Sequence, residues 1–99
     1  MGSVARIKDE EYLVQIRWQP CLVCLAPAGQ AHHLMTGEDV DPGAMGARSG
    51  DDWAVPLCHR HHGELHQHGN ETRWWAMQGV DAEAWAKASW AYWSGLKNG

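Results

Sequence analysis

The chain has 99 residues, enough for one small domain, with 44% hydrophobic residues, 20% charged residues and a formal net charge of −4. This balance excludes an intrinsically disordered chain, and no apolar run approaches the roughly 18–20 residues that a membrane span needs. The acidic excess also excludes the strongly basic surface typical of nucleic-acid-binding proteins, so such binding would need a local patch, bound metal ions or a second protein.

The first predicted element is an amphipathic helix over about residues 6–19. Its apolar side chains Tyr12, Leu13 and Ile16 are spaced to lie on one helical face. Pro20 ends the helix, because proline disfavours the helical conformation of the residue before it.

A metal-ligand region follows over about residues 20–68, and it contains all three cysteines and all seven histidines of the chain. Within it, residues 37–52 are rich in glycine and acidic residues, which predicts an exposed loop. Three cysteines cannot all pair with one another, and their fraction is far below that of a disulfide scaffold. Metal ligation is therefore the better interpretation of the cysteines.

Two helices are predicted over about residues 70–95. Asn70 caps the first, which Gly79 ends, and Asp81 caps the second, which Gly95 ends. The second helix is rich in large aromatic residues. Trp85, Ala88 and Tyr92 share one face, and Trp90 and Trp93 share an adjacent one. Because a large aromatic side chain buries roughly 150–250 Å², we expect these residues to pack in the core or a subunit contact, with base stacking as the alternative.

The cysteines form two short-spaced pairs with a histidine. Cys21 and Cys24 make a Cys-x-x-Cys pair, and Cys58 and His61 make a Cys-x-x-His pair. Two such pairs are typical of a structural zinc site, whereas a redox Cys-x-x-Cys pair would need no second pair. Zinc also accepts the longer spacing from Cys58 to His62, which is the alternative ligand set.

The remaining histidines suggest a second metal site. His62 and His66 are four residues apart, which places both on one face of a helix. This pair exists only if His61 completes the zinc site, and we therefore prefer His61. His32 and His33 are adjacent, so in a strand they face opposite sides, and one can bind metal while the other faces a substrate. Imidazole ligands suit zinc, nickel and similar ions better than magnesium.

The segments CLVC, AHHL and PLCHRHHGELH resemble those of the HNH nucleases, also called His-Me finger or ββα-metal nucleases, in their zinc-stapled form. The flanking segments QIRWQPCLVC and HGNETRWWAMQGVDAEAWA are similar to small phage and prophage HNH proteins, a group that includes a RecA-dependent nuclease. The resemblance covers about residues 6–94. It implies a single α+β domain with a zinc-stapled ββα-metal core, an N-terminal helix and Trp-rich C-terminal helices.

The resemblance also implies roles for individual residues. His33 matches the general base that activates the attacking water. His32, His62 and His66 match ligands of a catalytic divalent metal (zinc, nickel, manganese or magnesium). The implied ligands of the structural zinc are Cys21, Cys24, Cys58 and His61.

One residue of the family pattern, an asparagine before the Leu-Cys dipeptide, is absent here. Its usual task is to orient the general base. The nearest polar candidates are Asp51 and Asp52, and Asp51 is the better placed.

We therefore expect a metal-dependent endonuclease that hydrolyses DNA in the cytoplasm of a phage-infected or lysogenic bacterial host. Arg48 and Arg60 are candidate DNA contacts, although both also fit ordinary surface charges. Given the acidic balance, we expect weak binding by the isolated chain and help from a homodimer or a DNA-bound protein partner. The alternative is a non-catalytic zinc module that binds nucleic acid or protein and takes one metal per chain, where the nuclease takes two.

Overall fold

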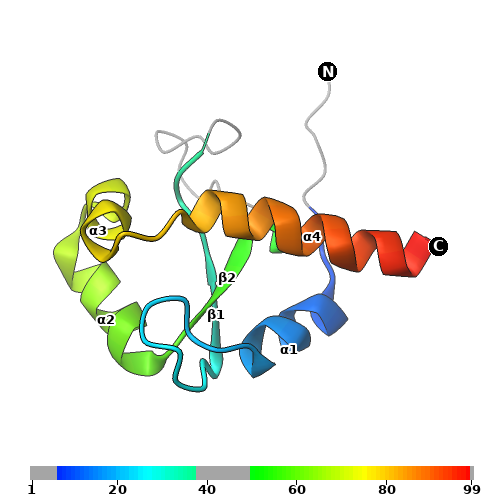
Figure 1. The fold of residues 1–99 in the computed structure, drawn as a ribbon, viewed down its shortest axis with the longest axis horizontal. Coiled ribbons are helices and arrows are strands. Elements are labelled where there is room, and N and C mark those ends of the chain that lie inside the picture. The colour runs from blue at the N-terminus through cyan, green and yellow to red at the C-terminus, as the bar shows by residue number, and fades with distance from the viewer. Residues whose placement is uncertain (1–6, 38–49, 99) are drawn as a thin grey trace.

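A two-stranded antiparallel sheet lies among the helices of an α+β fold (Figure 1). The computed structural model describes residues 7–37 and 50–98. In this part of the chain the elements are α1 (Glu10–Trp18), β1 (Gln30–His33), the short 3₁₀ helix η1 (Asp51–Trp53), β2 (Ala54–Leu57), α2 (His59–His68), α3 (Glu71–Gln78) and α4 (Ala82–Asn98). Figure 1 shows α4 on one side of the sheet, with α1 and α2 towards the other.

The register of the sheet places the two adjacent histidines at the end of β1. His32 pairs with Val55 and His33 with Ala54, while Gln30 at the start of β1 pairs with Leu57. All four residues of β2 are buried, whereas β1 alternates towards its end, with His32 buried and His33 half-buried. The predicted strand and the opposite directions of the two histidines are therefore confirmed.

Helix α1 begins later than the expected residue 6. Asp9 has an extended backbone and is the N-cap of a helix that begins at Glu10. Its Oδ1 accepts a hydrogen bond from the Tyr12 backbone N–H at 3.0 Å. The predicted apolar face is confirmed, because Tyr12, Leu13 and Ile16 are buried. The helix ends at Trp18, shortly before Pro20.

Helix α2 carries ligands for both candidate metal sites. Cys58 caps its first turn, and Gly69 ends it in the left-handed conformation with φ of 82°. His61 and Leu65 are buried, four residues apart on the inward face. His62 and His66 occupy the adjacent face, as their spacing predicts.

The two C-terminal helices have the predicted caps but not both predicted ends. Gly79 closes α3 in the left-handed conformation with φ of 69°, whereas α4 continues through Gly95 to Asn98. The expectation that Gly95 ends α4 is wrong, because Gly95 lacks the positive φ that turns a chain out of a helix. None of the helices in the described part of the chain combines the length and apolarity that crossing a membrane requires.

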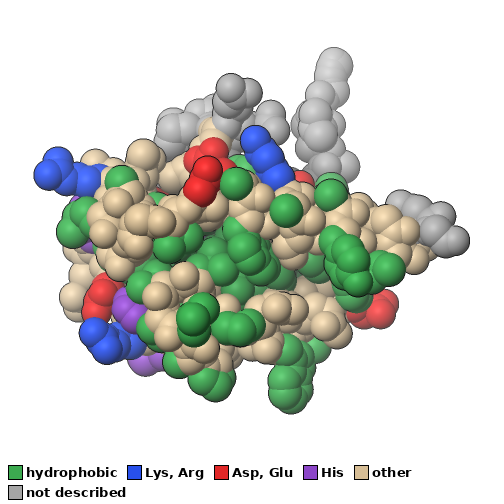
Figure 2. Space-filling model, in the orientation of Figure 1, with side chains coloured by type: hydrophobic (Ala, Val, Ile, Leu, Met, Phe, Trp, Pro, Cys, Tyr) green, Lys and Arg blue, Asp and Glu red, His purple; other side chains and the backbone are tan. Residues whose placement is uncertain are grey.

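The tryptophans contribute to packing, but not all on the predicted face. Trp74 and Trp75 are buried in the core, and Trp90 packs edge-on against Tyr12 with ring centroids 5.0 Å apart. Tyr92, expected to pack in the core or in a subunit contact, does not pack in the core and is 72% exposed. The reason is that α4 turns Ala82 and Ala86 towards the core, so Tyr92 points away from it. Figure 2 shows hydrophobic side chains gathered between α4 and the elements below it.

The glycine-rich segment predicted as an exposed loop over 37–52 is corrected at its end. Asp51 and Asp52 are half-buried and begin η1, where the Asp51 backbone N–H donates to Ile7 O at 2.8 Å. Residues 38–49, including the candidate DNA contact Arg48, lie outside the described residues.

Candidate functional site

Four candidate zinc ligands come together at one end of the sheet. Cys21 and Cys24 lie in the loop after α1, Cys58 precedes α2, and His61 lies in its first turn. The Sγ atoms of Cys24 and Cys58 are 3.8 Å apart, and Nδ1 of His61 lies 3.2 Å from Sγ of Cys58 and 3.9 Å from Sγ of Cys21. Tetrahedral zinc with bonds of about 2.3 Å to sulfur places its ligand atoms about 3.8 Å apart. The donor set and its spacing therefore fit a structural zinc ion.

The electrostatics of this cluster favour a thiolate at Cys21. Burial raises the pKa of the Cys21 thiol, but hydrogen bonds from the backbone N–H groups of Cys24, Cys58 and Val23 outweigh it and lower the pKa to about 6. Burial and the neighbouring cysteine side chains instead raise the pKa of Cys58. Negative charge therefore forms at Cys21, which is fully buried, before it forms at Cys58.

The geometry separates His61 from His62. His61 belongs to the cysteine cluster, whose four ligand atoms all lie within 4.8 Å of one another. His62 lies in a second cluster with His32 and His66. The preference for His61 as the histidine of the first cluster thus agrees with the structure.

The second cluster joins β1 and α2 through three histidine nitrogens. Nδ1 of His32 lies 3.1 Å from Nε2 of His62, and Nε2 of His66 lies 3.0 Å from the same atom. Metal–nitrogen bonds of about 2.0–2.1 Å in tetrahedral geometry correspond to a spacing of about 3.3 Å between ligand atoms. Three imidazoles at this spacing can hold a transition-metal ion.

Two neighbouring side chains orient the imidazoles of this cluster. Nε2 of His32 donates to Glu71 Oε2 at 2.8 Å, because a carboxylate oxygen can only accept. Nδ1 of His62 donates to the side-chain oxygen of Gln30. In neutral histidines these bonds leave lone pairs on Nδ1 of His32 and Nε2 of His62, the two atoms that face each other. Since facing lone pairs repel, the arrangement favours a bound cation between them.

Burial keeps His62 in the neutral state that metal binding requires. Burial lowers the pKa of His62, and the charges of His32 and His66 lower it further, to about 4. Burial raises the pKa of Glu71, but hydrogen bonds from His32, the Trp75 indole and the Met35 backbone outweigh it, and the net pKa is lowered. At neutral pH His62 is therefore neutral and Glu71 is ionised.

Sequence reasoning missed Glu71 and Gln30. Glu71 is the first residue of α3, and it also accepts a hydrogen bond from the Trp75 indole at 3.0 Å. It is 39 residues from His32 in the chain, so no local motif connects them. The one sequence signal was that Glu71 is an acidic residue in the first turn of a helix. The helix dipole alone explains that preference, so it does not indicate a metal site.

His33 has a carboxylate partner, as the choice of Asp51 over Asp52 predicted. Nε2 of His33 donates to Asp51 Oδ1 at 2.9 Å, and the other carboxylate oxygen of Asp51 accepts from the Asp9 backbone N–H at 2.8 Å. In neutral His33 this bond leaves a lone pair on Nδ1, which makes no hydrogen bond within the described residues. His33 remains 30% exposed, so water can reach it.

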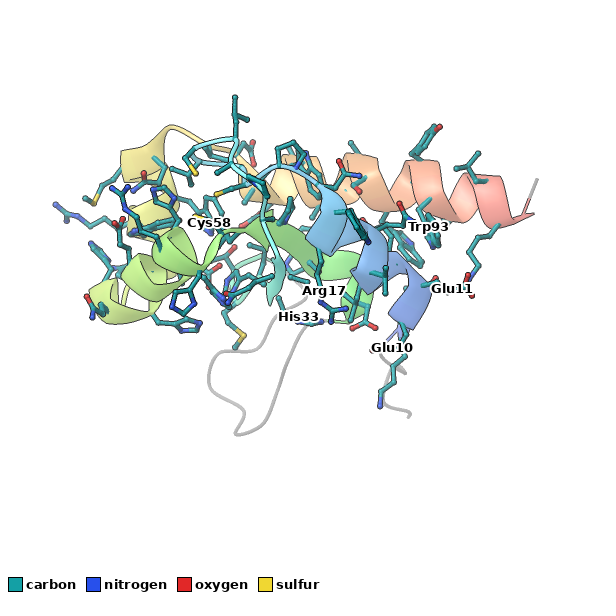
Figure 3. The ribbon with its side chains drawn as sticks, turned by 90° about the horizontal axis from the view of Figure 1, so that it is seen from below. Glu10, Glu11, Arg17, His33, Cys58 and Trp93 are labelled. Carbon is teal, nitrogen blue, oxygen red and sulfur yellow. The ribbon has the colours of Figure 1, made fainter. Side chains whose placement is uncertain are left out.

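The cysteine cluster and the proposed base His33 lie at opposite ends of the sheet. Cys58 follows the residue that pairs with the first residue of β1, whereas His33 is the last residue of β1, and both are labelled in Figure 3. Arg60, a candidate DNA contact, is exposed and pairs with Glu64 at 3.3 Å on the same helix. The cysteine cluster thus lies at one end of the sheet and His33 at the other, while the three imidazoles come from β1 and α2, where His62 contacts Gln30 at the start of β1.

The Glu71 contact predicts an effect on metal affinity. Replacing Glu71 with glutamine weakens the partner that orients His32, and such changes lower metal affinity by roughly 10–100-fold. We expect Glu71→Gln to bind its second metal equivalent that much more weakly in calorimetric titrations, with the first equivalent unchanged. The matched control is Glu64→Gln, on the exposed face of α2. Equal second-site affinity in Glu71→Gln and the wild type would contradict this role.

The comparisons with known proteins place the chain in a family. A family model described as "Protein of unknown function (DUF968)" matches residues 3–92. The chain belongs to the DUF968 family. This DUF968 chain is also 40% identical over 57 residues to "Uncharacterized protein YdfU" of Escherichia coli (strain K12), an alignment that covers 58% of this chain and 16% of that protein. No solved structure matches the chain significantly.

Proposed function

We propose that this DUF968 protein is a metal-dependent endonuclease of the HNH type that hydrolyses phosphodiester bonds in DNA. The observation that carries the proposal is that His33 is paired with Asp51, while the preceding residue of β1, His32, belongs to the three-histidine cluster. Phosphodiester hydrolysis needs a base for the attacking water and a cation at the phosphate. Consecutive residues of β1, His32 and His33, provide one group of each kind.

The cysteine cluster supports the structural part of this proposal. Cys21, Cys24, Cys58 and His61 would hold a zinc ion that ties the loop after α1 to the start of α2. That attachment fixes the position of α2, which carries His62 and His66. The first metal would thus keep the ligands of the second in place without touching the substrate.

In the proposed reaction His33 acts through its Nδ1 atom. A water molecule attacks the phosphorus, and its proton passes to Nδ1, while Nε2–H keeps its hydrogen bond to Asp51. The carboxylate of Asp51 stabilises the imidazolium that forms. The bond from phosphorus to the leaving oxygen breaks, and that oxygen takes its proton from solvent. A divalent cation held by His32, His62 and His66 would supply positive charge to the phosphate and the leaving oxygen.

Metal stoichiometry separates this function from the alternative of a non-catalytic zinc module. His66 is exposed and lies outside the core, so we expect His66→Ala to fold, to bind one metal instead of two and to lose plasmid nicking. His68→Ala is the matched control, because His68 is exposed near the end of the same helix and outside both clusters.

The experiment measures metal content by mass spectrometry and nicking of supercoiled plasmid with Mg²⁺, Mn²⁺, Ni²⁺ and Zn²⁺. Two metals in the wild type, one in His66→Ala, and nicking only where two are bound would support the nuclease. One metal in the wild type and no nicking with any ion would favour the zinc module.

The proposal includes partners and a setting. Because the net charge is −4, we propose that efficient action on DNA needs a homodimer or a DNA-bound protein. The setting that we propose is the cytoplasm of a phage-infected or lysogenic bacterium. The exposed side chains of Tyr92 and Leu96 on α4 are the surface that we would examine first for a partner contact.

A further inference from the structure

A groove opens beside the three-histidine cluster, between the C-terminal end of α1, the start of β1 and α2. Its volume is about 500 Å³. Arg17 of α1, labelled in Figure 3, lines it together with Gln30 of β1. His62, Gly63 and His66 of α2 also line it. Two metal ligands of the proposed nuclease therefore form part of its wall.

The groove has a positive charge balance in a chain that is negative as a whole. Arg17 is exposed, and no carboxylate in the described part of the chain pairs with its guanidinium. No acidic side chain lines the groove. By contrast, Arg60 pairs with Glu64 and Lys97 pairs with Asp9. An unpaired guanidinium in such a place is suited to an anionic group such as phosphate.

A glycine inside α2 leaves the wall of the groove open. Gly63 lies between the two metal ligands of α2, in a helical position where alanine would stabilise the helix. A Cβ atom added at Gly63 would meet no atom within 4 Å, so packing within the chain does not require glycine here. What the missing side chain provides is room for a ligand to approach the helix backbone beside His62 and His66.

We propose that this groove binds the DNA phosphodiester strand next to the scissile phosphate, with Arg17 contacting a phosphate and Gly63 admitting the strand to α2. The inference rests on the proposed nuclease function and adds to it the path of the substrate strand. Gln30 contributes to both parts, because it lies in the groove and orients His62.

The test measures binding of a short fluorescent DNA duplex to protein loaded with both metals. The His33→Ala background prevents cleavage of the probe. We expect Arg17→Gln to weaken binding about tenfold and to reduce the slope of log affinity against log salt by about 0.9, the change for one lost phosphate contact. Arg73→Gln, which changes an exposed side chain of α3 outside the groove, should change neither quantity.

Gly63→Ala gives a second, sharper readout. It should keep or raise the melting temperature and both metals, yet weaken DNA binding, because the new methyl group occupies the strand's path. The matched control is Gly95→Ala on α4, also a helical glycine with open space around it, which should be stabilising and leave binding unchanged.

The outcomes distinguish the two proposals. Wild-type protein that nicks plasmid and binds duplex while Arg17→Gln and Gly63→Ala bind as tightly would overturn the groove alone. A metal-loaded protein that neither binds nor nicks DNA would overturn the nuclease function and the groove with it. Loss of affinity in both variants with metals and fold intact would support the groove.

Discussion

Cys24→Ser is expected to lose the structural zinc and with it the fold of the region around α2. Structural zinc sites contribute roughly 10–16 kcal/mol of apparent binding free energy, whereas a small domain has only about 5–15 kcal/mol of total stability. Cys24 is exposed, and its Sγ atom lies 3.8 Å from that of Cys58. The substitution therefore removes one ligand and little packing.

Cys58→Ser provides an independent check on the same site. The Cys58 side chain also caps α2, accepting from the His61 backbone N–H at 3.5 Å, and serine is a good residue at a helix N-cap. A loss of structure in Cys58→Ser therefore reports on the metal and not on the cap. The measurement is circular dichroism melting with zinc content, beside wild type treated with a chelator. Either variant melting like untreated wild type would contradict the zinc assignment.

His33→Ala should abolish most cleavage while leaving the protein folded. The substitution removes the proposed base and no metal ligand, and general bases contribute on the order of 10²–10⁴-fold to rate. The side chain is partly exposed and belongs to neither ligand cluster. We expect a drop in plasmid-nicking rate of that size, with two metals still bound and an unchanged melting temperature.

The neighbouring aspartates provide controls for this base. Asp51→Asn should also slow nicking, because Asp51 holds Nε2 of His33 at 2.9 Å. Asp52→Asn should nick at nearly the wild-type rate, since the described residues show no contact of Asp52 with His33. Nicking by His33→Ala at the wild-type rate would show that the base is a different residue.

Local patterns predicted the parts of the fold that depend on neighbours in sequence. The caps Asn70 and Asp81, the helix end at Gly79 and the buried face of α1 follow from side-chain chemistry within one or two turns. The two ligand pairs around Cys24 and Cys58 also follow from short spacings. Each of these features depends only on residues that lie close together in the chain.

Contacts between distant segments could not be predicted in this way. The bond from His33 to Asp51 depends on how η1 returns to β1, and only the family resemblance indicated it. Glu71 reaches His32 because α3 packs against α2, which brings residues 39 positions apart into contact. The exposed position of Tyr92 reflects the rotation of α4 about its axis, which its partners on α1 and in the core determine. Helical periodicity alone does not determine which of the two neighbouring aromatic faces of α4 is buried.

A metal titration coupled to plasmid nicking tests whether cleavage depends on a second metal ion. Zinc-loaded protein with one metal per chain is titrated with a second divalent ion, and plasmid nicking is measured at each point. We expect little cleavage at one equivalent, a rise in proportion to the second equivalent, and a plateau at two metals per chain, with no rise in His66→Ala. Full cleavage at one equivalent, or none at two with any of the four ions, would contradict the proposed two-metal nuclease.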